Sequence, residues 1–194
     1  MKKNFIYIAI SSIVVIACST LKAPIDTPEV NQKIKDEGKP EMLLGHCSRS
    51  CLLESPYKEW FVKNYDDYSV DAVTSQKIKP LLRDKNLLVF MGTWCGDSRR
   101  EVPRLAKIID YCGLKDSQLQ LVMVDYREGM YKQSPQHEEK DRNIFRVPTI
   151  IVYSGKKEMG RIIEFPRESL EKDLLAILTN SGYVPNYSDG NKNH

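Results

Sequence analysis

The clearest pattern in the chain is a set of short apolar stretches separated by polar ones. Residues 86–91 hold a continuous apolar run after Asn86, and residues 118–125 form a second stretch that is apolar at residue 119 and at residues 121–124. Both stretches are typical of strands buried on both faces of a sheet. Residues 149–153 and 160–165 are two further strands, joined by a turn-like segment at residues 154–157 as in a hairpin. These runs predict the strands of one sheet.

Helical patterns occupy other parts of the chain. Residues 99–112 and 168–179 place apolar side chains three and four positions apart, as amphipathic helices do. Residues 75–83 predict a further helix, with Thr74 or Ser75 as its N-cap. The order of strands and helices predicts an α/β fold in which helices cover both faces of a central sheet.

The remaining segments set the predicted domain boundaries. Residues 18–45 are rich in charged residues and proline and predict a flexible tether. Residues 46–67 carry apolar and aromatic side chains at helical spacing and predict one short helical extension that packs on the main domain, residues 68–182. Residues 138–144 predict a short helix in a polar stretch, and residues 183–194 predict a polar, disordered tail.

The N-terminal segment has a pattern of its own. Two lysines precede an apolar run, residues 5–17, which as a helix would cover roughly 20 Å, against roughly 30 Å for a hydrocarbon core. The run ends in Val-Ile-Ala-Cys, which resembles the lipobox of bacterial lipoproteins. The resemblance implies a signal peptide at residues 1–17, a lipid on Cys18, and a membrane-anchored protein of the bacterial envelope that faces the periplasm. Ser19 does not resemble the inner-membrane retention signal, which favours the outer membrane.

Charge and cysteine content narrow the functions. The chain has 29 basic and 26 acidic residues, and two of the basic ones lie in the predicted signal peptide, so the rest is about neutral. No basic stripe with interleaved aromatic residues is present, which argues against nucleic acid as a partner. Five cysteines are too few for a disulfide scaffold of this length, so each needs its own explanation. We expect no cofactor.

One cysteine lies where a predicted strand turns into a predicted helix. The segment Gly-Thr-Trp-Cys-Gly-Asp-Ser, residues 92–98, puts Cys95 at the start of that helix. Unpaired amide N–H groups and the positive end of the helix dipole favour the thiolate, which is the nucleophilic form of a cysteine. We therefore expect Cys95 to be the reactive thiol.

The pattern Trp-Cys-Gly-x-Cys/Ser between a strand and a helix resembles the active loop of the thioredoxin superfamily. Two prolines and one glycine also fit the family pattern: Pro103 at its helix kink, Pro148 at its cis-proline, and Gly160 in its last hairpin. The resemblance covers roughly residues 68–180. It implies a thioredoxin fold with a central mixed sheet, and it places a cis-Pro148 against Cys95.

The resemblance also assigns roles to residues. The catalytic positions would be Cys95, Ser98 and Pro148. The positions that contact the partner, a client protein with a thiol or a disulfide, would be Trp94, Gly96, Asp97 and Val147.

Several residues depart from the family pattern. Ser98 replaces the second cysteine, so the loop holds no thiol that could resolve a mixed disulfide. Val89 stands where many thioredoxins bury an acidic residue that assists proton transfer. The charge of Asp97 opposes thiolate formation, whereas Arg99 and Arg100 favour it.

The other cysteines have separate interpretations. Cys112 lies 17 residues after Cys95, roughly 25 Å along the same helix. That exceeds the roughly 7 Å between Cα atoms that a disulfide allows, so we expect a buried, structural thiol. Cys47 and Cys51 fit a local structural disulfide, a pair that resolves Cys95, or two separate thiols. His46 beside them does not complete a metal site, because a fourth ligand is missing, and we expect no metal.

Two functions remain. The first is an envelope thiol–disulfide oxidoreductase that acts through mixed disulfides at Cys95. The second is a non-catalytic binding module that uses the groove of the fold. A peroxidase is disfavoured because Gly92 stands where peroxidases of this fold usually carry threonine.

Overall fold

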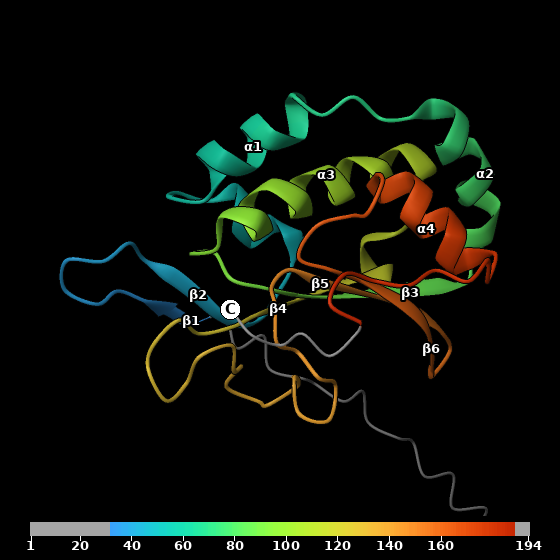
Figure 1. Cartoon of the computed structure of the whole chain (residues 1–194). Coiled ribbons are helices and arrows are strands. Elements are labelled where there is room, and N and C mark those ends of the chain that lie inside the picture. Colours follow the sequence, from blue (N-terminus) through green and yellow to red (C-terminus); the bar gives the residue numbers. More distant parts are fainter. Residues whose placement is uncertain (1–31, 189–194) are drawn as a thin grey trace, which may run out of the picture.

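A six-stranded mixed sheet forms the centre of the computed structural model, which describes residues 32–188 (Figure 1). The strand order is β1-β2-β4-β3-β5-β6. β3 and β4 pair in parallel, and the other neighbours pair antiparallel. The strands are β1 (Gln32–Ile34), β2 (Met42–Cys47), β3 (Lys85–Met91), β4 (Leu119–Met123), β5 (Thr149–Ser154) and β6 (Lys157–Ile163). The predicted α/β class and mixed sheet are confirmed.

Four α-helices and two short 3-10 helices accompany the sheet in the described part of the chain. They are η1 (Arg49–Leu53), α1 (Lys58–Asp66), α2 (Ala72–Leu82), α3 (Gly96–Cys112), η2 (Asp116–Gln118) and α4 (Leu170–Leu178). α2 begins earlier than predicted because Asp71, and not Thr74 or Ser75, is its N-cap: the Asp71 carboxylate accepts the Thr74 N–H at 3.1 Å. α3 and α4 agree with the predicted helices to within three residues.

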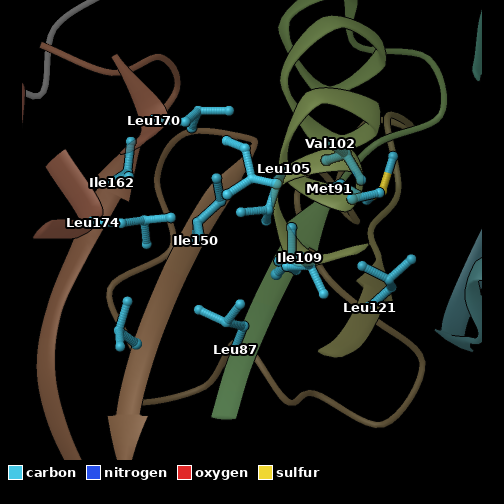
Figure 2. Close-up of a cluster of buried hydrophobic side chains, with 14 of the residues drawn as sticks. Leu87, Met91, Val102, Leu105, Ile109, Leu121, Ile150, Ile162, Leu170 and Leu174 are labelled. Carbon is cyan, nitrogen blue, oxygen red and sulfur yellow. The ribbon is translucent and has the colours of Figure 1, made fainter. Parts of the chain in front are cut away.

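The main core lies between the sheet and the helices. α3 packs against α1, α2 and α4 and lies over the central strands. Figure 2 shows Leu105 and Ile109 of α3 among Leu87 and Ile150 of the sheet, and all four side chains are fully buried or nearly so. Burial of this apolar face holds α3, and therefore the residue at its N-terminus, in a fixed position on the sheet.

The helices cover one face only, which corrects the prediction that they cover both. All four α-helices contribute to the main core, and residues 124–148 cross the opposite face without a helix (Figure 1). A second, smaller cluster is buried there: Phe90, Val122, Val124, Val147 and Ile151. Alternate residues of one strand point to opposite faces, so Phe90 packs in this cluster while its neighbours Val89 and Met91 pack in the main core.

The helix predicted over residues 138–144 does not form. Asp141 and Asn143 have φ angles of +62° and +54°, in the left-handed region that a right-handed helix excludes. Asp and Asn tolerate this region because their short polar side chains can bond the local backbone. The segment is a series of turns.

The predicted tether is wrong over residues 32–45. β1 and β2 form an antiparallel pair, and β2 joins the central sheet beside β4. Met42, Leu43 and Leu44 are buried. This short apolar run is part of a strand because β1 pairs with residues 42–44, and the edge of β4 pairs with residues 45–47.

The predicted single helix over residues 46–67 is also wrong. His46 and Cys47 belong to β2, and η1 and α1 are separate pieces. Ser55 and Pro56 lie between the pieces, where a proline disfavours helical geometry in the residue before it. α1 does pack on the main domain, against α3, as predicted for this extension.

The predicted tail is ordered as far as residue 188. The Tyr183 hydroxyl donates to Asp173 Oδ2 at 2.8 Å, and burial together with this hydrogen bond raises the pKa of Tyr183. Asn186 Nδ2 donates to the Phe165 carbonyl at 2.8 Å. The segment follows α4 and folds back onto the domain (Figure 1).

The predicted signal peptide and lipid site at Cys18 lie outside the described residues. Between residues 32 and 188, no helix has the length and apolar character needed to cross a membrane.

Candidate functional site

Cys95 lies at the junction between β3 and α3, and it is the N-cap of α3. Its side chain is partly exposed and packs toward the smaller cluster on the helix-free face. The Cys95 thiol donates to the Val147 carbonyl, with Sγ 3.1 Å from the oxygen. Cys95 therefore lies at the end of α3 where the first-turn amide N–H groups have no intrahelical partner.

The loop that faces Cys95 contains a cis peptide bond between Val147 and Pro148, as the resemblance implied. Two hydrogen bonds hold this loop: Thr149 Oγ1 donates to the Arg146 carbonyl at 2.7 Å, and the Glu164 N–H donates to the Pro148 carbonyl at 2.7 Å. Val147 is buried, but its carbonyl oxygen points at the thiol. The structure therefore brings Cys95, Val147 and Pro148 together.

The Ser98 side chain lies on the buried side of the active loop and forms a hydrogen bond across it. It is fully buried, and its Oγ accepts the Gly92 N–H at 3.3 Å. A second hydrogen bond connects the loop to β2: Thr93 Oγ1 accepts the Leu43 N–H at 3.2 Å. Residue 98 thus braces the loop that carries Cys95.

Trp94 covers Gly92 and fixes the other side of the loop. A Cβ atom at Gly92 would lie 2.4 Å from Trp94 Cε2, so the indole occupies the space of any side chain there. The indole N–H donates to the Val124 carbonyl at 2.9 Å. The threonine of a peroxidase would not fit at position 92 with Trp94 in this place.

The charges around the loop are paired with one another. Asp97 and Arg100 form an ion pair of 2.6 Å, and Arg100 also contacts Glu101 at 2.6 Å. Arg99 Nε donates to the Thr93 carbonyl at 2.5 Å, and its guanidinium lies over the Trp60 ring. The opposing charges noted in the sequence are thus largely engaged with other groups. Gly96 is exposed, and a Cβ there would meet no atom within 4 Å.

Two aromatic groups that the sequence analysis missed flank Cys95. On the Trp94 side, Tyr131 lies 5.5 Å and Tyr126 lies 6.4 Å from the indole, ring centroid to ring centroid. On the cis-proline side, Phe145 and Phe165 both contact the ring of Tyr187. A signal was available, because aromatic residues are unusual in polar segments such as residues 126–145 and 183–188.

The remaining cysteines lie away from Cys95. Cys112 is buried at the far end of α3, as predicted, and burial raises the pKa of its thiol. Cys47 and Cys51 join the core on the helix side of the sheet, whereas Cys95 packs toward the opposite side. The structure therefore does not place this pair beside Cys95. Their pairing with each other stays a prediction.

His46 faces the helix-free side of the sheet. Its Nε2 lies 2.5 Å from Glu138 Oε1. Among residues 32–188, no group of three or more His, Cys, Asp or Glu side chains is arranged to hold a metal ion.

Two solved structures are similar to the chain. The first is a protein of unknown function from Pseudomonas aeruginosa, with a TM-score of 0.51 and 13% identity over 69% of this chain and 92% of the other. The second is an HIV epitope-scaffold protein, with a TM-score of 0.50 and 14% identity over 71% and 93% of the two chains. At these identities the likeness shows the fold alone. No curated protein sequence matches the chain.

A family model for thioredoxin matches residues 53–175. This range contains the strand β3, the loop with Cys95, α3 and the cis-Pro148 loop. The match covers well over half of the chain and agrees with the mixed sheet and the position of the cysteine. The chain belongs to the thioredoxin family.

Proposed function

We propose that the protein exchanges thiols and disulfides with client proteins through a mixed disulfide at Cys95. The observation that carries this proposal is the position of Cys95: it caps the N-terminus of α3, is partly exposed, and lies 3.1 Å from the carbonyl beside cis-Pro148. A thiolate at this position is stabilised by the helix terminus and can be reached from solvent.

The exchange balances without a cofactor. The Cys95 thiolate attacks one sulfur of a client disulfide, a new disulfide forms between Cys95 and the client, and the other client sulfur leaves as a thiolate. A different thiolate of the client, or an external low-molecular-mass thiol, then attacks the client sulfur of the mixed disulfide and releases Cys95 as a thiolate. With the client's own thiol the result is a rearranged disulfide and no net oxidation.

Val147 gives the site a further function in this scheme. Its carbonyl accepts a hydrogen bond from the Cys95 thiol. A client chain that lies along residues 146–148 would donate a backbone N–H to the same carbonyl and compete with the thiol. Client binding would then free the Cys95 thiol from this hydrogen bond.

The test is the rate of Cys95 alkylation against pH, measured on the wild-type chain with Cys95→Ser as the blank. An inflection well below the usual cysteine value of about 8.5 supports a nucleophilic site. Client capture follows in the same chain: disulfide-linked partners should appear with Cys95 and disappear with Cys95→Ser. An inflection at or above the usual value, together with no captured partner, contradicts the proposal.

Ser98→Cys tests whether the missing second thiol limits the chemistry. Residue 98 lies one helical turn after Cys95, where a cysteine could attack a mixed disulfide. We expect this variant to reduce insulin with dithiothreitol at least about tenfold faster than the wild type, because a second thiol completes the cycle. Equal rates would show that another part of the site is limiting.

A non-catalytic binding module is the alternative function, and one observation favours it. Val89, fully buried in the main core, provides no titratable group beneath the active loop for moving a proton. In this case the groove beside Cys95 would bind a partner without exchange.

We further propose that the lipobox-like sequence anchors the protein in the bacterial envelope through Cys18. The charge, length and final cysteine of the first eighteen residues support this proposal. Cys18→Ser should move the protein from the membrane to the soluble fraction of a bacterial lysate. Retention of this variant in the membrane fraction contradicts the anchor.

A further inference from the structure

The C-terminal segment, residues 183–188, ends against the two loops that surround Cys95. Tyr187 is the contact residue. Its ring lies 6.4 Å from the ring of Phe145 and 6.5 Å from that of Phe165, both edge-on. The Arg146 guanidinium lies 4.8 Å from the centre of the same ring.

Polar contacts hold the segment in the same place. The Tyr187 hydroxyl donates to Glu164 Oε2, and the Asn186 amide donates to the Phe165 carbonyl at 2.8 Å. The hydrogen bond to Glu164 raises the pKa of Tyr187, and the carboxylate of Asp97 adds to that effect. Tyr187 thus contacts both the cis-proline loop, at Phe145 and Arg146, and the loop after β6, at Glu164 and Phe165.

The residues that receive Tyr187 are neighbours of the site. Phe145 and Arg146 directly precede Val147, which accepts the Cys95 thiol. Glu164 donates its N–H to the Pro148 carbonyl, so the loop after β6 is attached to the cis-proline loop. Any extended chain that approached Cys95 along residues 146–148 would meet Tyr187.

We propose that Phe145, Arg146, Glu164 and Phe165 form a binding pocket for an aromatic side chain of the client, and that Tyr187 fills this pocket until a client displaces it. The pocket's chemistry defines the ligand. Two aromatic edges and a guanidinium accept a ring face, and the Glu164 carboxylate accepts a hydroxyl, so a tyrosine fits best. The binding of a client side chain in this pocket rests on the proposed function. The occupation of the pocket by Tyr187 does not rest on it.

The segment is suited to displacement. Its contacts with the pocket include the Tyr187 ring and two side-chain hydrogen bonds, and Val184 within the segment is half-exposed. A tethered ligand competes at a high effective concentration, so it blocks weak ligands and yields to clients that gain further contacts, such as a disulfide to Cys95. The apparent affinity for a client equals the intrinsic affinity multiplied by the fraction of molecules in which the pocket is open.

A cysteine-free peptide tests the pocket apart from the redox chemistry. The probe is the hexapeptide Tyr-Val-Pro-Asn-Tyr-Ser, the sequence of residues 183–188, labelled with a fluorophore. Its binding is followed by anisotropy with the full chain carrying Cys95→Ser, so that no disulfide can form. The variants Tyr187→Ala and Tyr187→Phe are compared with Tyr111→Ala, which removes a half-exposed tyrosine from the surface of α3.

We expect Tyr187→Ala to bind the probe at least about tenfold more tightly than the parent, because it opens the pocket without removing its walls. Tyr187→Phe keeps the ring and loses the hydroxyl, so it should give a smaller gain, and Tyr111→Ala should give none. Adding Phe165→Ala to Tyr187→Ala should weaken binding several-fold. Phe165 is half-exposed, so this change leaves the core intact.

Equal binding by the parent and Tyr187→Ala, or no binding by either, overturns the proposal. A probe with its last tyrosine replaced by alanine that binds as well as the original overturns the aromatic specificity. None of these outcomes depends on the reactivity of Cys95, so a failure of the proposed exchange chemistry would be recognised separately by the alkylation experiment.

Discussion

The two ends of α3 carry the same side chain in opposite settings. Cys95, at the N-terminus, is partly exposed and donates to the Val147 carbonyl across the active loop. Cys112, at the C-terminus, is 3% exposed, and its Sγ lies 3.6 Å from the Ser75 carbonyl. Burial raises the pKa of the Cys112 thiol.

The comparison shows that one rigid element can place one thiol at the surface and another in the core. The apolar face of α3, which includes Leu105 and Ile109, fixes both ends on the sheet. Cys95 faces the helix-free side, where loops and aromatic rings leave room for a partner. Cys112 completes the main core. The difference comes from where each end lies and not from the residue type.

The largest expected effect is a difference in reactivity between the two thiols. In the native protein, Cys95 should react with iodoacetamide at least about 100-fold faster than Cys112, because Cys112 must wait for local opening of the fold. Peptide mapping by mass spectrometry after a short pulse gives both rates. In concentrated urea the two rates should become similar. Similar rates in the native protein would show that the C-terminal end of α3 opens readily.

Gly92, three residues before Cys95, provides the next test. Gly92→Ala places a Cβ 2.4 Å from the Trp94 indole, so either the ring or the loop must move, at a cost of about 1–3 kcal/mol of unfolding free energy. Urea unfolding measures this cost. Gly96→Ala is the matched control in the same loop, because its Cβ meets nothing within 4 Å, and it should be neutral or slightly stabilising. Equal stabilities for the two variants would contradict the packing of Trp94 on Gly92.

The glycine after Cys112 should show a smaller effect with a different cause. Gly113 is the C-cap of α3 with φ +69°, and a Cβ there would meet no neighbour. Gly113→Ala should therefore cost about 1 kcal/mol from backbone strain alone. Gly113→Asn should cost less, because asparagine tolerates the left-handed region. The same urea measurement applies, and a larger loss for Asn than for Ala would contradict this cause.

The smallest effect is a pH dependence of stability at Cys112. Burial raises the pKa of this thiol in the folded state above the usual cysteine value, so as pH rises the unfolded chain loses the thiol proton first. Ionisation then favours unfolding, and the contribution of Cys112 to stability falls as pH rises. The difference in unfolding free energy between the wild type and Cys112→Ala should shrink between about pH 8 and about pH 10. A constant difference would show that the thiol ionises equally in both states.

Local features of the site could be predicted from the sequence. The apolar run before Cys95 and the helical period after it placed the thiol at a helix N-terminus, because these patterns depend on neighbours in the chain, and the structure has both of them. The position of cis-Pro148 beside Cys95 came only from the family resemblance, because residues 95 and 148 are far apart in the chain. The strand β2 was missed because residues 42–44 are a short run within a charged segment, and they become a strand by pairing with β1 while residues 45–47 pair with β4.

The sequence by itself determined the α/β class and the cysteine at the start of α3, because strand and helix periods and the preferences of helix termini are local properties. The proline that faces this cysteine followed only from the family resemblance. Only the tertiary structure decided which face of the sheet the helices cover, which cysteines lie apart from Cys95, and that Tyr187 reaches the loops around it. These outcomes depend on contacts between residues far apart in the chain. Such contacts follow from which apolar faces can be buried together, and no local pattern encodes that choice.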